Sequence, residues 1–388
     1  MSGIVLSASV RQNLLSLQST ADLLSTTQVR LSTGRKVNTA LDNPTNFFTA
    51  QGLDNRANDI SNLLDGIGNG VQVLQAANTG ITSLQKLVDT AKSIASQVLQ
   101  TTVGYTPKST VTSGVPLTGN AANLVDGTII KSGDVLTIAA TGGGTATSIT
   151  FGASYSLAQL NAALAANNLS ASLDNTNKLV ITTNNDAASS TIGAVVYPGA
   201  GTGTLTFGAV APPVVDAASQ TIRANLVSQY NNIITQITTT AQDASFNGIN
   251  LLNGDNLKLT FNETGKSTLN IAGVTYSATG LGLNTLVGGT DFLDNNSANA
   301  TITKLSNASN ALRSEASSLG SNLSIVQIRQ DFSKNLINVL QTGSSNLTLA
   351  DTNEEAANSQ ALSTRQSIAV SALALANQSQ ASVLQLLR

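Results

Sequence analysis

Few residues in this chain could perform catalysis or bind a metal ion. The sequence contains no cysteine and no histidine, which excludes zinc sites of the Cys/His type, cysteine nucleophiles and Ser-His relays. The densest acidic group is Asp351, Glu354 and Glu355, and it lacks the glycine and the spacing of a calcium loop. Thr352 and Glu355 instead have the T-x-x-E spacing of a helix capping box. The sequence therefore predicts no catalytic residue, no cofactor and no metal site.

The charge pattern argues against nucleic acid or a membrane as a partner. The chain has 19 basic and 21 acidic residues, and only 10% of its residues are charged. A nucleic-acid interface needs clustered Lys and Arg to neutralise phosphates, and no basic stripe is present. The N-terminus has no basic region ahead of an apolar segment, and no apolar run approaches the ~20 residues that span a bilayer. We therefore expect neither a secretory signal peptide nor a transmembrane helix.

Apolar residues recur at helical spacing in the N-terminal part of the chain. The first stripe ends at Gly34, which can adopt the left-handed conformation that stops a helix. Asn43 and Pro44 then have the order of a helix cap and a first helical residue, so we expect a second, long helix from there. The first stripe comprises Val10, Leu14, Leu17, Ala21, Leu24 and Leu31. The second runs through Ile60, Leu64, Ile67, Val71, Leu74, Ile81, Leu84, Val88, Ala91, Ala95 and Val98.

The same spacing returns toward the C-terminus. One stripe comprises Leu305, Ala308, Leu312, Leu319 and Val326, and we expect Ile328, Phe332, Leu336 and Leu340 to continue it. The final segment repeats Leu362, Ala369, Ala376 and Val383 at intervals of seven. Both terminal segments contain few charges for interhelical pairs and many Ser, Thr and Asn, which are weak helix formers. We therefore expect the two ends to become ordered only on assembly, when many copies pack together.

The middle of the chain has a different composition. Five of the six prolines lie between about residues 101 and 217, with Gly142-Gly143-Gly144 and short runs of β-forming residues such as Val135–Ile138 and Leu179–Thr183. This pattern predicts an inserted β-rich domain with one helix over 156–166. A smaller β element is expected near residues 257–276, where two extended runs flank a turn at Gly265.

Four segments of the sequence resemble those of bacterial flagellins. They are Arg30-Leu-Ser-Thr-Gly-Arg-Lys-Val-Asn38 with Ala40-Leu-Asp-Asn-Pro44, then Ser245-Phe-Asn-Gly-Ile-Asn-Leu-Leu252, then Thr279-Gly-Leu-Gly-Leu283, and finally Ala374–Gln378 through Val383–Arg388. The resemblance covers about residues 1–103 and 218–388, in the order of the family. The intervening segment resembles no family that we can name.

The resemblance implies a mainly α fold in which both chain ends form a long antiparallel helical bundle or coiled coil, with a small β-hairpin and an inserted β-rich outer domain. The implied domains are a D0 helix at 1–40, D1 helices at 41–103, the insert at 104–217, the remainder of D1 with the hairpin at 218–348, and a second D0 helix at 349–388. The subunit interface is expected at Val10, Leu14, Leu17, Leu24, Leu31, Ala369, Ala376, Val383 and Leu386.

The implied function is that of a structural subunit which forms a homopolymer, the extracellular flagellar filament for swimming motility. The resemblance also implies type III export without a cleaved signal peptide, an export chaperone on the C-terminal helix, and filament-cap and hook-junction partners. The segment Leu84–Lys92 matches the stretch read by Toll-like receptor five, but Thr90 replaces an apolar Leu of recognised flagellins and Lys86 provides no bidentate guanidinium. Weak or no receptor activation is therefore expected.

Two alternatives remain at the level of sequence. The hook-filament junction protein of the same superfamily shares the terminal patterns, although residues 245–252 and the C-terminal signature favour a flagellin. The insert could also bind carbohydrate, with Tyr105, Phe151, Tyr155, Tyr197 and Phe207 as its aromatic residues. A zinc protease in the insert is excluded, because the chain has no histidine.

Overall fold

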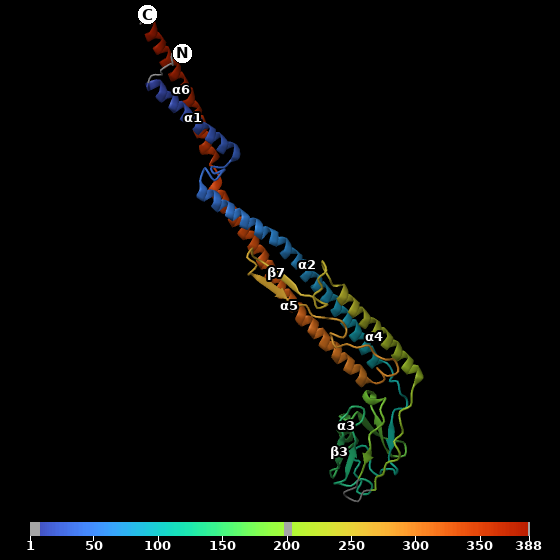
Figure 1. Ribbon diagram of the computed structural model, residues 1–388. Coiled ribbons are helices and arrows are strands. Elements are labelled where there is room, and N and C mark those ends of the chain that lie inside the picture. Colours follow the sequence, from blue (N-terminus) through green and yellow to red (C-terminus); the bar gives the residue numbers. More distant parts are fainter. Residues whose placement is uncertain (1–7, 198–203, 387–388) are drawn as a thin grey trace. The chain divides into compact units, whose positions relative to one another are not determined.

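The computed structural model describes residues 8–197 and 204–386, without the side chains of Ser9, Gln380 and 383–386. The chain is mainly helical, with a small β-rich region in its middle (Figure 1). Its helices are α1 (Ala8–Thr33), α2 (Pro44–Gln100), α3 (Leu157–Ala165), α4 (Ala217–Asp243), α5 (Asn295–Thr348) and α6 (Thr352–Leu386). Its strands are β1 (Thr110–Thr112), β2 (Val135–Ile138), β3 (Thr147–Thr150), β4 (Leu169–Leu173), β5 (Leu179–Thr183), β6 (Val195–Val196), β7 (Leu257–Thr260) and β8 (Thr268–Ile271), with a 3-10 turn at Asn185–Ala187.

The chain divides into two compact units. The first comprises 1–69, 258–269 and 325–388, and the second comprises 70–257 and 270–324. The division cuts across α2 and α5 and does not follow the domain boundaries expected from the sequence, since residues 103 and 217 both fall inside the second unit. Those boundaries stay predictions.

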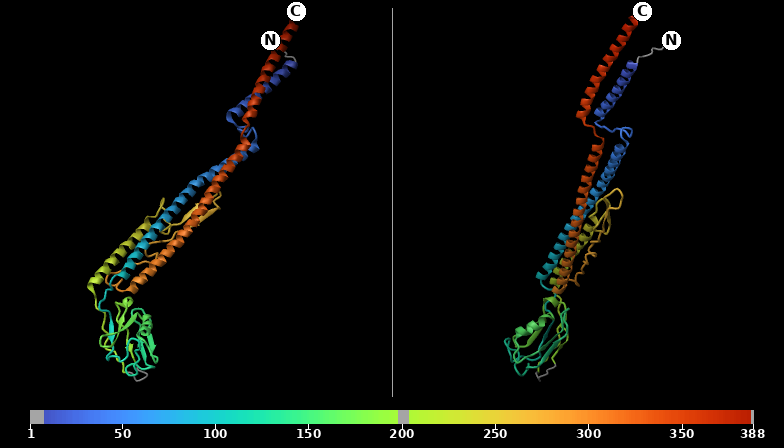
Figure 2. Two further views of the ribbon diagram at one scale, coloured as in Figure 1. Left: turned by 180° about the vertical axis from the view of Figure 1, so that it is seen from behind. Right: turned by 90° about the vertical axis from the view of Figure 1, so that its left-hand side faces the viewer.

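In the first unit, α1 packs against α6, and Figures 1 and 2 show these two helices side by side. The first half of α2 packs on the second half of α5 through Ala57, Ile60 and Leu340. The turn between β7 and β8 is fastened to both helices. Arg56 forms an ion pair with Glu263 at 2.8 Å, and the guanidinium of Arg329 lies 5.7 Å from the ring centre of Phe261.

In the second unit, one arginine closes the end of α2. Arg223, on α4, is 1% exposed and donates hydrogen bonds to the carbonyls of Val98, Thr101 and Thr102, and to that of Phe292. Near a helix end, carbonyls depend on partners outside the regular helical ladder. The carbonyl of Val98 also accepts from the amide and the hydroxyl of Thr101, and the guanidinium adds a further bond there, so that it holds α4 against the end of α2 and the loop that contains Phe292.

The β-rich insert has its own apolar core. Strands β1, β5 and β4 form one antiparallel sheet, and β3, β2 and β6 form another. Opposed pairs such as Val111–Ile181 and Leu136–Ile149 set the register. Helix α3 begins at a capping box in which Ser156 and Gln159 bond each other's backbone amides, and it buries Leu160 and Leu164 in this core.

The structure corrects three local expectations. The second extended run of the small β element ends at Ile271 and does not reach residue 276. The glycines of α2 also need a different account from the close helix packing or bend that their G-x-G-x-G spacing suggests: the helix continues without a break through Gly66 and Gly68, and an added Cβ there would meet nothing closer than Gln330 at 4.0 Å. Glu355 does not complete a capping box with Thr352, because its side chain contacts a distant residue described below.

Candidate assembly surface

The first unit holds the two helices in which the sequence places the assembly residues. Helix α1 ends at Thr33 because Gly34 has a φ of +66°, a conformation that glycine adopts without strain. Helix α6 begins beyond Asp351, whose Oδ1 accepts hydrogen bonds from the amides of Asn353 at 2.9 Å and Glu354 at 3.3 Å. The capping residue of α6 is therefore Asp351, not Thr352 as the sequence suggested.

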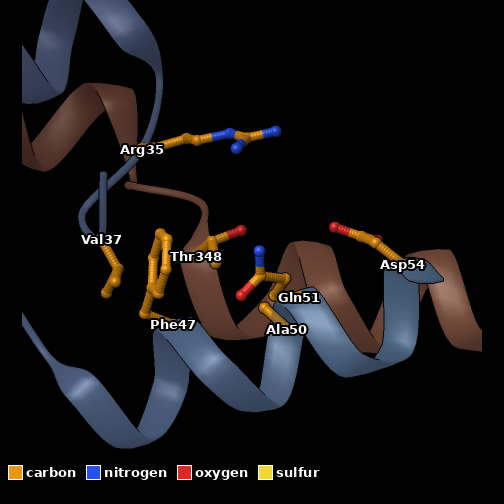
Figure 3. A pocket seen from close by; sticks show the side chains of 7 residues that line it. All are labelled: Arg35, Val37, Phe47, Ala50, Gln51, Asp54 and Thr348. Atoms are coloured by element: carbon orange, nitrogen blue, oxygen red, sulfur yellow. The ribbon is translucent and has the colours of Figure 1, made fainter. Parts of the chain in front are cut away.

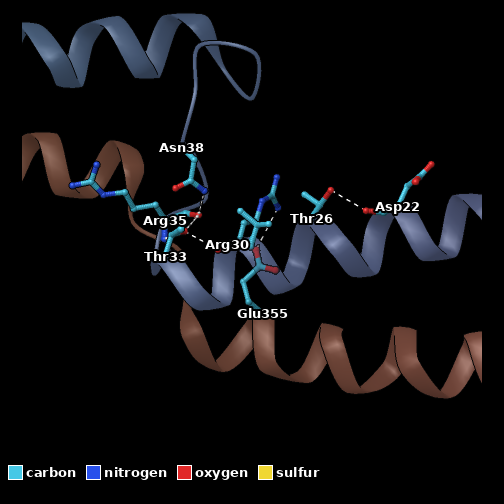
Figure 4. A network of polar contacts seen from close by, with 8 residues as sticks. Asp22, Thr26, Arg30, Thr33, Arg35, Asn38 and Glu355 are labelled. Atoms are coloured by element: carbon cyan, nitrogen blue, oxygen red, sulfur yellow. Dashed lines mark hydrogen bonds and ion pairs between the residues drawn. The ribbon is translucent and has the colours of Figure 1, made fainter.

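One ion pair joins the two terminal helices. Arg30 Nη1 on α1 lies 3.3 Å from Glu355 Oε1 on α6, and Figure 4 shows this contact between the helices. Glu355 is buried, and its side chain is 11% exposed against 37% for that of Arg30. The partner of Glu355 is therefore 325 residues away in the sequence, and a local sequence motif could not indicate it.

Two connecting segments lie beside this ion pair, one after α1 and one before α6, and backbone hydrogen bonds join them. The amides of Lys36 and Val37 donate to the carbonyl of Thr348, and the amide of Ala350 donates to the carbonyl of Gly34. Asp42 then closes the turn before α2, since its Oδ2 accepts from the amides of Thr39 at 2.8 Å and Asn38 at 2.9 Å. These two backbone hydrogen bonds lower the pKa of Asp42. The 34–37 and 348–350 segments are thus joined by backbone hydrogen bonds, and we call this pair of segments the crossing.

The contact face between α1 and α6 is narrow and partly polar. On α1, Val10, Thr20 and Thr27 are buried. The hydroxyl of Thr20 donates a hydrogen bond to the carbonyl of Ser16. On α6, half-buried residues recur at steps of three and four: Ser359, Leu362, Gln366, Ala369, Leu373 and Ala376. Small and polar residues bury little apolar area, so this pair has a weak hydrophobic contribution within one chain.

The residues expected at the subunit interface occupy several environments. Val10 is already buried at 3% exposure, while Leu17, Leu24, Ala369 and Ala376 are half-buried on the α1–α6 pair. Leu14 and Leu31 are exposed. The side chains of Val383 and Leu386 lie outside the described residues. The assignment of these residues to contacts between subunits therefore stays a proposal.

Two exposed apolar residues of α1 were missed by the stripe analysis. Leu15 is 70% and Leu23 is 53% exposed on α1, and both lie outside the heptad positions. Ile368 and Leu375 are exposed on α6. Counting apolar residues off the main stripe, and not only on it, would have found Leu15 and Leu23.

The prediction that Ile328 and Phe332 continue the apolar stripe of residues 305–326 is wrong. These two side chains are 68% and 57% exposed, whereas Val326, Ser333 and Leu340 occupy the buried face. The buried face follows a seven-residue step from Val326 and therefore passes a serine, which a search for apolar residues overlooks. Four exposed residues at helical spacing, which we call the α5 stripe, are Ile325, Ile328, Phe332 and Val339.

A pocket of about 160 Å³ lies next to the start of α2. Val37, Phe47 and Ala50 provide apolar lining, and Thr348 and Gln51 contribute polar groups. Figure 3 shows Arg35 and Asp54 at opposite sides of this pocket, with the Asp54 carboxylate on the side facing Arg35. No ion pair joins these two described residues. The pocket therefore combines an apolar interior with one charge of each sign at its edge.

Within residues 8–197 and 204–386, no group of three acidic side chains could hold a metal ion. In the same part of the chain, no helix is long and apolar enough to cross a bilayer. The surface of the first unit is instead distinguished by exposed apolar residues on helices that begin and end the chain. Helices of this kind also occur in known proteins.

The family model described as the bacterial flagellin N-terminal helical region matches residues 5–128, and the one described as the C-terminal helical region matches 302–387. Together they cover more than half of the chain. The chain belongs to the bacterial flagellin family. The N-terminal match includes α1 and α2 and extends past β1 to residue 128, while the C-terminal match includes most of α5 and α6.

Curated flagellins show the same relationship. The chain is similar to the flagellins FljM and FljK of Caulobacter vibrioides, each 33% identical over 165 residues, and to FljO of the same organism at 31%. Each alignment covers 42% of this chain and 59% of the relative. The chain thus matches less than two thirds of the length of these flagellins.

Proposed function

We propose that this chain is the structural subunit of an extracellular flagellar filament, which it forms by self-polymerisation for swimming motility. The observation that carries the proposal is the exposed apolar surface of the first unit, on helices that match the flagellin family. When a neighbouring copy removes apolar residues such as Leu15, Ile328 and Phe332 from water, the free energy of the assembly decreases. Flagellin family membership supports the same conclusion.

Seeded polymerisation, followed by electron microscopy of the purified chain, tests this function. Leu17→Asp and Leu386→Asp are each expected to leave a soluble monomer and abolish filaments, because a carboxylate in an apolar contact must be desolvated. Asn307→Asp, which adds the same charge on an exposed face of α5, is the matched control and should polymerise normally. Normal filaments from either leucine variant would contradict the proposal.

The partners follow from the same proposal. They are an export chaperone that holds the C-terminal helix, the filament cap, and the hook-junction proteins. The subunit is exported through the flagellar type III channel without a cleaved signal peptide, and it performs no catalysis and needs no cofactor. Co-purification with a chaperone that is lost on truncation after residue 350 would support the first of these partners.

A carbohydrate-binding insert receives no support from its aromatic residues. Phe151 is buried, and Tyr105, Tyr155, Tyr197 and Phe207 are half-buried. Phe151, Tyr155 and Tyr197 contact one another, and Tyr197 donates a hydrogen bond to Asp134 at 2.5 Å. Sugar recognition uses exposed aromatic faces, whereas these rings pack in or against the core of the insert. The hook-junction alternative is distinguished by the polymerisation test, since only a filament subunit should form long filaments alone.

Weak or no activation of Toll-like receptor five remains part of the proposal. In the stretch over 84–92, Lys86, Asp89 and Thr90 are exposed on α2 while Leu84 and Val88 are buried. The stretch therefore offers two lysines, the exposed Lys86 and the half-buried Lys92, without the planar fork of arginine. A reporter-cell assay with purified monomer, freed of other bacterial products, measures this directly, and potent activation would refute it.

A further inference from the structure

Phe332 is a large aromatic side chain that the described part of its own chain leaves mostly exposed. It is 57% exposed on α5, and it makes none of the ring contacts formed by the other described aromatics. Aromatic side chains dominate the energetics of protein interfaces when they enter a pocket. Phe332 therefore has the properties of an anchor residue whose pocket lies on another molecule.

The pocket beside α2 has the size and lining to receive such a ring. Its volume is about 160 Å³, with Val37, Phe47 and Ala50 in its lining. A cavity of roughly 150 Å³ with apolar walls binds benzene. The ring of a phenylalanine would thus find the space that it needs, with the half-buried ring of Phe47 as its most accessible apolar contact.

The charges around the two features match. Asp331 and Lys334 lie together on one side of Phe332 on α5 and form an ion pair at 3.9 Å, with side chains 74% and 55% exposed. Arg35 and Asp54 stand at opposite sides of the pocket. Each surface therefore presents one acid and one base beside its apolar centre, which allows two opposite-charge contacts across an interface.

The ring that enters the pocket must come from a second copy. The pocket includes Thr348, the last residue of α5, and Phe332 lies on the same helix. Sixteen residues of helix separate them by about 24 Å, so Phe332 cannot reach the pocket of its own chain. A contact between two different patches is heterologous, and repeated contacts of this kind build an open polymer.

We propose that Phe332 of each subunit inserts into the pocket between Val37, Phe47 and Ala50 of a neighbouring copy. Asp331 and Lys334 then face Arg35 and Asp54 of that copy. This inference rests on the proposed filament function and assigns one of its contacts.

Cysteine cross-linking tests the contact cleanly, because the natural sequence contains no cysteine. Phe332→Cys and Gln51→Cys are prepared as separate single variants, mixed in equal amounts, polymerised on seeds of the natural chain and oxidised with diamide, which accepts the electrons and protons of the two thiols. A disulfide requires Cβ atoms about 4 Å apart. We expect a dimer that contains both variants in the filament and not in the monomer mixture.

The control replaces Phe332→Cys by Val339→Cys, which lies about 10 Å further along the same exposed stripe. This pair should give at least tenfold less dimer. Filaments that form without the 332–51 dimer, or with equal dimer from the control, would overturn the inference. Failure of the unmodified chain to polymerise would instead overturn the filament function itself.

A second measurement does not depend on cysteine. Phe332→Ala should raise the critical concentration for polymerisation at least tenfold, as expected for an interface anchor, while Val287→Ala, at an exposed site in the second unit, leaves it unchanged. Arg35→Glu and Asp331→Lys should each raise it, and the double variant should recover most of the loss. An unchanged critical concentration for Phe332→Ala, or no recovery in the double variant, would contradict the proposed contact.

Discussion

Arg30 and Glu355 form an ion pair at 3.3 Å between the helices at the two ends of the chain. The pair sits beside the crossing of the 34–37 and 348–350 connections, where the α1–α6 contact begins. Because the rest of that contact buries small and polar residues, this ion pair is one of the few specific interactions that fix the pairing of α1 with α6 in a single chain.

Glu355→Gln should loosen α1 and α6 in the monomer. An ion pair with one partly exposed member contributes about 0.5–1 kcal/mol, and losing it should speed amide hydrogen exchange across residues 8–33 and 352–379 by about twofold to fivefold. Glu354→Gln, which neutralises the exposed neighbouring carboxylate, is the matched control and should have little effect. Equal exchange rates in both variants would show that the ion pair does not order the helices.

The same experiment tests the order of the natural chain. In dilute monomer, residues 8–40 and 350–386 should exchange faster than 50–100 and 300–340, since α2 and α5 bury apolar residues such as Leu74 and Leu312 completely. In filaments the difference should largely disappear. Equal protection of the two regions in the monomer would contradict ordering on assembly.

Arg223→Met should destabilise the second unit by roughly 3 kcal/mol or more. A hydrogen bond from a charged donor contributes about 1.5–3 kcal/mol, and the variant leaves the buried carbonyl of Phe292 without this partner and removes the guanidinium from the carbonyls of Thr101 and Thr102. Urea unfolding monitored by circular dichroism measures the loss. Arg313→Met, at an exposed position on α5, provides the comparison, and a similar midpoint for both variants would disprove the role of Arg223.

Removal of the insert should preserve polymerisation. The two connections to the insert run antiparallel and are bonded to each other, with Thr106 N donating to Val214 O at 2.9 Å and Asp216 N to Gly104 O at 3.0 Å. Residues 106–214 can therefore be replaced by a short turn without moving the ends of α2 and α4. Electron microscopy should show filaments, and a soluble, exported variant that forms none would indicate essential subunit contacts in the insert.

The insert should lose stability in acid through Asp126. Burial alone would raise the pKa of this carboxyl, but hydrogen bonds from the Thr118 hydroxyl and from the amides of 128–130 outweigh burial and lower it. A lowered folded-state pKa stabilises the fold above the unfolded value, near 4, and this contribution disappears as the pH falls. Asp126→Asn should thus lower the melting temperature at pH 7 and lower it less at pH 3.

Thermal unfolding by circular dichroism at the two pH values checks this prediction. Asp186→Asn, also in the insert, serves as the reference substitution. A deficit in the Asp126 variant that does not shrink at low pH would show that the carboxylate charge is not responsible.

Local signals in the sequence predicted much of the fold. Gly34 and Pro44 mark the end of α1 and the start of α2 because helix termination and capping depend on a few neighbouring residues. The strands at Val135–Ile138 and Leu179–Thr183 likewise follow from their own β-forming residues. The order in which β5 lies between β1 and β4 could not be predicted, because it depends on pairings between distant segments.

The assembly surface was predicted less well, for a related reason. Periodicity shows that a helix has an apolar face but does not show what covers it. Val10 and Phe332 both belong to apolar stripes, yet one is buried within the chain and the other is exposed. Glu355 was assigned to a local cap, whereas its carboxylate pairs with Arg30 across the fold.

The crossing of the 34–37 and 348–350 segments has a mechanical consequence. Backbone hydrogen bonds tie these two stretches together, so neither can rotate without moving the other. A torque on α1 and α6 is therefore transmitted through both connecting segments, and these segments act together as a single pivot. Because the tie uses amides and carbonyls, a substitution at Lys36 or Val37 keeps the hydrogen bonds, whereas one at Gly34 strains the pivot through its φ of +66°.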